Sequence, residues 1–524
     1  MMSYKYIFLA ILVCCFTVMP GNAQRSRIIK ADYTRVAGTL NRSFDYCVGA
    51  GRANEGLRAD WQQQLALVKK DCGFRYLRMH GLLTDDMGVY MEDKKGNPVY
   101  NWQYIDVLYD YLLQTGVKPF VEIGFMPSAL ASNNKSIFWW KGNISYPKDE
   151  QKWSNLITAL VQHFTDRYGR EEVVTWYFEV WNEPNLKDIF FAGTMDDYFK
   201  LYSITTAAVK KVDKRYKTGG PATAGSAWIP EFLKYCKSSS TPVDFVSTHE
   251  YGVNSGFVDA DGSSTTILSQ RYNSIYAEVN NSRKQIEASS FPNLELHYTE
   301  WSSSYTPTDP IHDSYHEAAY ILDKLKKSGN AAQSMSYWTF TDIFEENGPR
   351  TTPFHGGFGL LNYQSIRKPA FYAYNYLHRL ANKELENADS SSYICRDDKG
   401  NIQLLCWNFT ITHPGDSVSN QTYYKRDLPS RSTAPLEIYL AKIPSGTYTV
   451  KVFKTGYRSN DAYTAYLDMG APSQLSVPLV KQLKQITNDS PVSTQTITID
   501  KTGVWKTSYP LRENDVLLIE ISKK

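Results

Sequence analysis

Short apolar runs alternate with longer amphipathic segments through residues 43–380. Eight of the runs have the length and composition of buried strands, at 44–49, 74–79, 119–125, 174–180, 219–223, 245–248, 294–299 and 335–340. Between them, apolar residues recur three and four positions apart, which predicts helices at 61–70, 104–114, 153–168, 195–212, 267–286 and 316–327. This alternation predicts an α/β fold, a (β/α)8 TIM barrel over residues 43–380.

A doubly wound open sheet is the competing arrangement for the same alternation of elements. That fold carries a glycine-rich phosphate loop directly after its first strand. Here Gly49 and Gly51 follow the first strand, and their spacing does not match such a loop. The barrel is therefore the favoured fold.

The pattern changes beyond Leu380. Six strand-like runs, at 392–395, 403–409, 436–441, 448–453, 494–499 and 516–521, are separated by clusters of Gly, Pro, Asn, Asp and Ser. They predict a C-terminal β-sandwich domain over residues 381–524. We favour a structural support for the barrel over a separate sugar-binding role. Residues 24–42 precede the barrel and are a candidate strand of this β-domain.

Composition and charge narrow the class of partner. The chain of 524 residues is 42% hydrophobic and 14% aromatic, which is enough to build sizeable cores. Its formal net charge is only +3, and no run of basic residues stands out. Nothing here indicates binding to nucleic acid or to an anionic membrane surface.

Residues 1–23 have the features of a cleavable signal peptide. Lys5 supplies the positive start, residues 6–19 are apolar apart from one Thr, and small residues precede Gln24. The apolar run is shorter than the roughly 20 residues that a membrane span needs. We therefore expect a secreted or periplasmic protein without a membrane span. The residues before Cys14 match a lipoprotein signal poorly, so lipid anchoring is not expected.

Five cysteines remain after the signal peptide, so at least one thiol is unpaired within the chain. Cys395 and Cys406 flank a turn-like segment, and they are either bridged across a hairpin or separately buried. No metal site or cofactor is expected. His312 and His316 are spaced like a zinc pair, but Asp313 stands where that motif requires Glu.

Two glutamates stand where a buried strand ends. Glu183 follows the fourth strand-like run, and Glu300 ends the seventh. Working residues of a (β/α)8 barrel gather at the C-terminal ends of its strands. A lone glutamate there is usually just a solvated carboxylate. Two glutamates at matched positions are the minimum that cleavage of a glycosidic bond requires.

Five segments, taken together and in order, resemble glycoside hydrolase family 39. They are residues 76–90 (YLRMHGLLTDDMGVY), 178–185 (FEVWNEPN), 244–251 (DFVSTHEY), 337–346 (YWTFTDIFEE) and 353–360 (PFHGGFGL). The resemblance covers nearly the whole chain after the signal peptide. It implies a retaining enzyme, since the family contains β-xylosidases and α-L-iduronidases that both work with retention.

The resemblance also implies a role for each matched residue. Glu183 would be the general acid/base and Glu300 the nucleophile, so Glu183 must be protonated at rest. Tyr251 would orient Glu300 through its hydroxyl. The implied substrate-binding residues are His80, Phe125, Asn182, His249, Tyr251, Tyr305, Trp338, Glu345 and Glu346.

The choice of substrate depends on Glu345 and Glu346. Adjacent residues point apart, so one would reach the sugar while the other faces the loop. In the β-xylosidase branch an acidic pair here binds hydroxyls of a neutral sugar, whereas an iduronidase must hold a carboxylate with cationic or backbone donors. Arg350 lies close enough in sequence to offset the acidic pair, which keeps the second reading open.

The favoured function is a secreted retaining exo-glycosidase that removes terminal β-xylosyl residues from an oligosaccharide or glycoside. An α-L-iduronidase-like or other family 39 exo-glycosidase is the alternative. A non-catalytic glycan-binding protein is the third reading, and the presence of both glutamates disfavours it. The aglycone and the oligomeric state are not fixed by the sequence.

Overall fold

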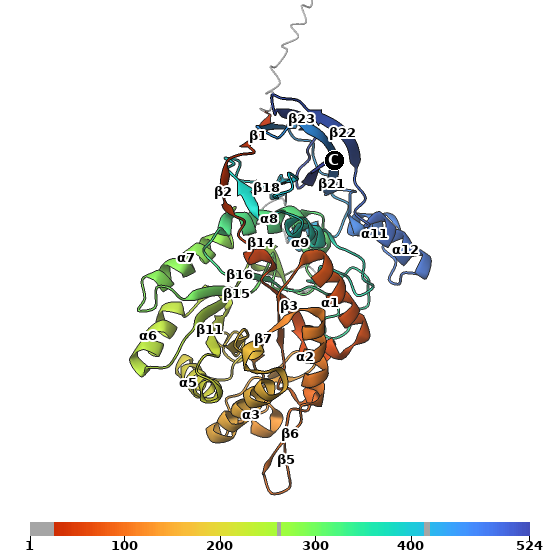
Figure 1. Cartoon of the computed structure of the whole chain (residues 1–524). Helices are drawn as coiled ribbons and strands as arrows, with labels where there is room; N and C mark the ends of the chain where they lie inside the picture. The colour runs from red at the N-terminus through yellow and green to blue at the C-terminus, as the bar shows by residue number, and fades with distance from the viewer. Residues whose placement is uncertain (1–25, 259–263, 413–419) are drawn as a thin grey trace, which may run out of the picture.

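A computed structural model describes residues 26–258, 264–412 and 420–524 (Figure 1). The expected signal peptide, residues 1–23, lies outside the described residues. Within the described ranges, no helix is both long and apolar enough to cross a membrane.

Eight parallel strands close into a barrel, and they follow one another around it in chain order. They are β3 (Cys47–Arg52), β4 (Tyr76–His80), β7 (Lys118–Ile123), β10 (Tyr177–Val180), β11 (Lys217–Thr223), β12 (Phe245–Tyr251), β15 (Glu295–Ser302) and β16 (Ser334–Tyr337). Each overlaps one of the eight predicted strands. The predicted (β/α)8 barrel is confirmed.

A helix follows each barrel strand. In order these are α1 (Ala59–Cys72), α2 (Gln103–Thr115), α3 (Glu150–Tyr168), α5 (Met195–Val212), α6 (Ile229–Ser239), α7 (Tyr276–Glu287), α8 (His316–Ser328) and α9 (Pro369–His378). Local sequence sets their ends: Thr194 and Asp197 form a capping box at the start of α5, and α1 stops at Gly73, whose φ of 81° suits a residue without Cβ. Helices α6 and α9 fill the two gaps where the pattern indicated only room for a helix.

The helix predicted at 267–286 is wrong in its first half. Ser264–Leu268 is a strand, β14, which pairs with β13 (Val253–Val258) in a hairpin beside the barrel mouth. The apolar spacing in this stretch suits either element, and its β-branched Thr and Ile residues favour the strand. Helix α7 begins only at Tyr276.

The C-terminal domain contains two sheets. Seven strands form one of them, in the order β2 (Val36–Thr39), β17 (Lys383–Leu385), β18 (Ser392–Arg396), β19 (Ile402–Trp407), β24 (Val516–Lys523), β21 (Gly446–Thr455) and β22 (Ser493–Ile499). The second sheet is β1 (Arg27–Asp32), β20 (Leu436–Ala441) and β23 (Trp505–Tyr509). Side chains of both sheets, such as Ile29 and Ile519, share one apolar core, so the predicted sandwich is confirmed.

The N-terminal segment belongs to this β-domain by its pairing. Strand β1 pairs with β20 and strand β2 pairs with β17 before the chain enters the barrel. Figure 1 shows β1 and β2 in the same part of the molecule as the C-terminal strands. Two helices, α11 (Ala462–Asp468) and α12 (Val477–Ile486), extend from the domain, and their cluster includes Phe354 of a barrel loop. The two ends of the chain therefore build one domain that packs against the barrel.

The bridge considered between Cys395 and Cys406 does not form. Both thiols are free and buried, and in the hairpin Cys395 lies opposite Gln403 while Cys406 lies opposite Ser392. Cys395 joins the core shared with the barrel, whereas Cys406 joins the core of the β-domain. The two side chains thus occupy opposite faces of the sheet.

The interior of the barrel is layered. Its N-terminal end is filled by Cys47, Phe120, Tyr177 and Phe245, with the rings of Phe120 and Tyr177 stacked at 4.9 Å. Side chains alternate along a strand, so residues two positions later face the same interior. The next layer is therefore charged, and it contains Arg78, Glu122 and Glu179. This layer supports the pocket above it.

Candidate active site

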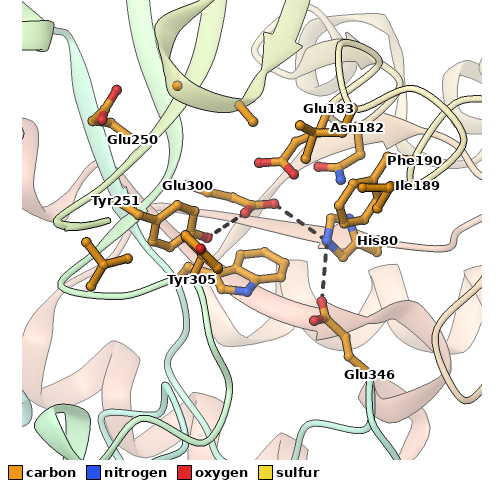
Figure 2. A pocket seen from close by; sticks show the side chains of 15 residues that line it. His80, Asn182, Glu183, Ile189, Phe190, Glu250, Tyr251, Glu300, Tyr305 and Glu346 are labelled. Carbon is orange, nitrogen blue, oxygen red and sulfur yellow. Dashed lines mark hydrogen bonds and ion pairs between the residues drawn. The ribbon is translucent and has the colours of Figure 1, made fainter. Parts of the chain in front are cut away.

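A cavity of about 530 Å³ opens at the C-terminal ends of the barrel strands (Figure 2). Its lining consists of His80, Asn182, Glu183, Leu186, Ile189, Phe190, Ala224, Gly225, Glu250, Tyr251, Val253, Glu300, Tyr305, Trp338 and Glu346. Among these described residues there are four glutamates and no Lys or Arg. The pocket is therefore rich in carboxyl groups and lacks a direct cationic ligand for an anion.

Glu183 lies just beyond β10, on a backbone that leaves the strand sharply. Trp181 and Glu183 both have positive φ, 73° and 43°, and the amide of Glu183 donates to the carbonyl of Ala222 on β11 at 2.8 Å. Pro184 then prevents the strand from continuing. A glutamate rarely adopts a positive φ, so the surrounding fold must stabilise this conformation. The fold thereby directs the side chain of Glu183 into the pocket.

The carboxyl group of Glu183 is buried beside other carboxyl groups. Its Oε1 lies 2.9 Å from Nδ1 of His249. Burial raises its pKa well above the ordinary value, and the negative charge of Glu300 raises it further, although the guanidinium of Arg78 opposes both effects. Glu183 thus favours its protonated form.

Glu300, on β15, is surrounded by donors. The hydroxyl of Tyr251 donates to its Oε2 at 2.7 Å, and Arg78 donates a guanidinium hydrogen to its Oε1. Nε2 of His80 lies 3.5 Å from Oε1 (Figure 2). These contacts hold the carboxylate in one orientation, with its charge compensated from below by Arg78.

Arg78 organises the charged layer beneath the pocket. Its side chain is fully buried and forms ion pairs with Glu122 and Glu179, each at 2.8 Å, as well as with Glu300. It also donates to Oδ1 of Asn182 at 2.9 Å. Burial alone would lower the pKa of Arg78, but the three carboxylates outweigh it and raise the pKa overall. The guanidinium therefore fixes Asn182 and Glu300 relative to each other.

His80 is neutral at the floor of the pocket. Its Nδ1 lies 2.7 Å from Glu122, and burial together with the charge of Arg78 lowers its pKa to about 3. Rings of Phe125, Phe138 and Trp338 surround it, with centroid distances of 5.8, 6.0 and 4.7 Å. The pocket is closed by aromatic side chains at this end.

Glu345 and Glu346 point apart, as expected, and only one of them reaches the pocket. Glu346 lines it, with Oε1 3.8 Å from Nε2 of His80, and burial and the charge of Glu300 raise its pKa well above the ordinary value. Glu345 instead forms ion pairs with Arg52 at 3.0 Å and Arg58 at 3.2 Å outside the lining. Glu345 therefore does not line the cavity, and its role in binding substrate stays a prediction.

Two further predicted residues lie behind the lining. Phe125 supports His80 from the side, and His249 is fully buried beneath Glu183. The remaining predicted residues, His80, Asn182, Tyr251, Tyr305, Trp338 and Glu346, line the pocket with the two catalytic candidates. Tyr305 is 49% exposed at the rim, where its ring meets that of Tyr251 edge-on at 6.1 Å.

Sequence reasoning missed Arg78, Glu122 and Glu179, as well as Glu250 in the pocket wall. A signal for the first three was present, since a charged residue inside an apolar strand must find a partner when it is buried. Arg78 also stands two positions before His80, on the same face of β4. No such signal marks Glu250, which lies between His249 and Tyr251 in the motif at 244–251.

Glu183, His249 and Glu300 lie close together, with a nitrogen or oxygen atom of each within 4.8 Å of the others. Their existing partners suit proton transfer better than metal binding: Glu300 accepts from Arg78 and Tyr251, and the guanidinium repels a cation. One oxygen of Glu183 and one of Glu300 are thus no more than 4.8 Å apart. Retaining glycosidases hold their two carboxyl groups about 5–5.5 Å apart, whereas inverting ones need roughly 6.5–9.5 Å.

Comparison with known proteins agrees with this geometry. The sequence model "Glycosyl hydrolases family 39" matches residues 27–505. The chain is 43% identical over 366 residues to a β-xylosidase of Caldicellulosiruptor saccharolyticus, covering 69% of this chain and 74% of that protein. The α-L-iduronidases are more distant: the mouse protein is 24% identical over 40% of this chain and 33% of its own length.

Two solved structures superpose on nearly the whole chain. A family 39 enzyme of Xanthomonas axonopodis pv. citri has a TM-score of 0.93 at 44% identity, covering 97% of this chain and all of that one. A monomeric β-xylosidase of Caulobacter crescentus CB15 has a TM-score of 0.92 at 44% identity, covering 95% of this chain and all of that one. With its barrel, its paired carboxyl groups and these relatives, the chain belongs to glycosyl hydrolase family 39 and is a β-xylosidase-like glycosidase.

Proposed function

We propose that this glycosidase is a retaining exo-enzyme that removes terminal β-xylosyl residues through a covalent glycosyl-enzyme intermediate. The observation that carries the proposal is the approach of Glu183 and Glu300 within 4.8 Å at the ends of β10 and β15. At that spacing one carboxylate reaches the anomeric carbon while the other reaches the leaving oxygen, with no room for an intervening water.

The surroundings of the two carboxyl groups support one assignment of roles. Glu183, with its raised pKa, gives its proton to the glycosidic oxygen as the bond to the aglycone breaks. Glu300, held by Tyr251 and Arg78, attacks the anomeric carbon and forms an ester.

The second half of the cycle follows from the loss of charge. Once Glu300 is esterified, its negative charge no longer raises the pKa of Glu183, which then takes a proton from the water that hydrolyses the ester. Asn182, held by Arg78, lies beside Glu183 and supports the 2-hydroxyl of the sugar. The product keeps the anomeric configuration of the substrate.

The lining of the pocket supports a neutral sugar. No Lys or Arg belongs to the described lining, and Glu346 adds a further carboxyl group beside which a uronic acid would be unfavourable. Arg350 does not line the pocket. These observations favour a xylosyl residue over an iduronosyl residue.

The closed end of the pocket supports action on terminal residues. His80, with the rings of Phe125, Phe138 and Trp338 around it, blocks that end. In this proposal a single sugar lies between this wall and the catalytic pair, and a chain enters by its terminus. The signal-like residues 1–23 support a secreted or periplasmic location for such an enzyme.

The test is hydrolysis of a panel of aryl glycosides by the purified protein. We expect the aryl β-xyloside to be cleaved with the highest kcat/KM, and proton NMR of the first product to show the β-anomer. No turnover of any glycoside would overturn the enzymatic proposal. Turnover of an aryl iduronide alone would replace the substrate, and formation of the α-anomer would overturn the mechanism.

A further inference from the structure

An irregularity in β15 directs two consecutive side chains into the barrel. The pairing of β12 with β15 shifts register, so that Thr248 lies opposite Tyr298 while His249 lies opposite Glu300, and Thr299 is the extra residue. Tyr298 points outward, where its hydroxyl meets that of Ser282 on α7 at 2.9 Å. A bulge of this kind re-aims side chains next to active sites. Thr299 and Glu300 therefore both face the interior.

Thr299 lies between a carboxylate and an imidazole, and its single hydrogen can serve only one of them. Its hydroxyl donates to Oε1 of Glu179 at 2.6 Å, and Glu179 is ion-paired with Arg78. An ionised carboxylate accepts hydrogen bonds and donates none. The hydrogen of Thr299 is thus committed to Glu179, and its oxygen is left to accept.

The acceptor at Thr299 selects the tautomer of His249. Nε2 of His249 lies 3.2 Å from Oγ1 of Thr299, so this nitrogen must carry the hydrogen. In a neutral imidazole the other nitrogen is then an acceptor. That nitrogen, Nδ1, lies 2.9 Å from Oε1 of Glu183, whereas Oε2 of Glu300 is 3.6 Å away.

We propose that Thr299 and Glu179 are positioning residues that fix the Nε2–H tautomer of His249, so that Nδ1 accepts a hydrogen bond from the protonated carboxyl group of Glu183. We call the chain of hydrogen bonds from Glu179 through Thr299 and His249 to Glu183 the relay. It holds the proton on Glu183 until the oxygen of the leaving group takes it. The inference rests on the role of Glu183 as general acid, and it adds a cause for its protonation beyond burial and charge.

Other charged groups act on the same pair, Glu183 and His249. Arg78, the nearest cation, favours the ionised form of Glu183 and the neutral form of His249. Glu300 and Glu122 favour protonated Glu183. Burial lowers the pKa of His249 well below its ordinary value, which keeps the ring neutral as the relay requires. Glu346 and Tyr251 also lie within electrostatic reach of Glu183.

The first experiment compares T299V with T299S in the pH profile of kcat/KM on an aryl β-xyloside with a poor leaving group. Valine keeps the volume of threonine but offers no acceptor, so His249 is free to carry its hydrogen on Nδ1 instead of Nε2, where the N–H faces Glu183 and stabilises the carboxylate. We expect the basic limb of the T299V profile to move to lower pH by about one unit. T299S retains the hydroxyl and should keep the wild-type limb.

The second measurement reads the tautomer without any substrate. In protein labelled with 15N-histidine, we expect the resonances of His249, assigned by their loss in H249Q, to show a protonated Nε2 and an unprotonated Nδ1. A protonated Nδ1 in the wild type, or equal basic limbs for T299V and T299S, would overturn the proposal. An enzyme inactive on every xyloside would instead overturn the proposed function, while the NMR result would still decide the relay.

Discussion

Glu183 and Glu300 end two strands of one barrel, and yet their carboxyl groups meet opposite partners. Glu300 accepts from the hydroxyl of Tyr251 and from the guanidinium of Arg78. Glu183 is buried next to another carboxylate, and its closest polar neighbour is a neutral His249. In the proposed mechanism these surroundings suit Glu300 to act as the nucleophile and Glu183, whose pKa is raised, to act as the acid.

The difference between the two glutamates arises partly below the pocket. Arg78 contacts Glu300 directly and acts on Glu183 through space, while another of its N–H groups is bound by Asn182. The position of one buried guanidinium therefore contributes to the difference between the two carboxyl groups. Variants that remove either carboxyl group, or its partner, test this difference.

Removal of the nucleophile should have the largest effect. E300A leaves no group to attack the anomeric carbon, so we expect kcat on an aryl β-xyloside to fall by roughly 10⁴-fold or more. Azide fits the space of the lost carboxylate and should restore turnover with an α-xylosyl azide as product. Steady-state kinetics and NMR of the product provide the measurements. Rescue of E300A with a β-linked azide would exchange the two roles.

Removal of the acid should have a smaller effect that depends on the leaving group. We expect E183A to lose roughly 10²- to 10⁴-fold in kcat/KM on a xyloside with a poor leaving group, and far less on dinitrophenyl xyloside, which departs without a proton. The measurement is a plot of log kcat/KM against the pKa of the leaving phenol for both enzymes. A slope that is the same in E183A and in the wild type contradicts the assignment.

The pH dependence of kcat/KM tests the role of Glu183 a second time, with E183A as the control. Glu183 acts in its protonated form, so wild-type kcat/KM on the poor substrate should fall as pH rises through its raised pKa. Burial and the charge of Glu300 displace this basic limb upward from the range of an ordinary carboxyl group. The limb should disappear in E183A, because no acid is left to titrate.

The apolar pattern carried most of the information about the fold. Each of the eight barrel strands overlaps an apolar run, since both faces of a parallel strand are buried in this fold. The segment 267–286 failed because a short amphipathic stretch fits a strand as well as a helix, and only the pairing of β14 with β13 decides between them. The local spacing of apolar residues does not reveal a pairing between two separate segments.

The site was predictable where a strand ended and unpredictable where side chains met across the barrel. Glu183 and Glu300 were found from their positions after apolar runs. The partners of Arg78 come from β7, β10 and β15, and no spacing along the chain reveals such a meeting. The extra residue Thr299 in β15 is likewise visible only in the register with β12.

Removal of one donor from the nucleophile should cost less than removal of either carboxyl group. Y251F deletes the hydroxyl that donates to Oε2 of Glu300 at 2.7 Å, while Arg78 still holds Oε1. A hydrogen bond to a charged group contributes about 1.5–3 kcal/mol, so we expect kcat/KM to fall by roughly 10- to 100-fold. Y305F is the matched control, because Tyr305 lines the same pocket without a hydrogen bond to Glu300. An equal loss in both variants would contradict a specific role for Tyr251.

The smallest effects should come from Glu345 and Glu346, which repeat the comparison between identical side chains in different surroundings. Glu346 lines the pocket, so E346A should raise KM for a β-xyloside by about tenfold through the loss of a hydrogen bond to the sugar. E345A should change KM less than about twofold and act on thermal stability instead, since it removes the ion pairs with Arg52 and Arg58. Calorimetry and steady-state kinetics on both variants separate the two effects. If E345A raised KM as much as E346A, Glu345 would also contact the sugar. That result would contradict the assignment of Glu346 to the pocket and of Glu345 to the ion pairs outside it.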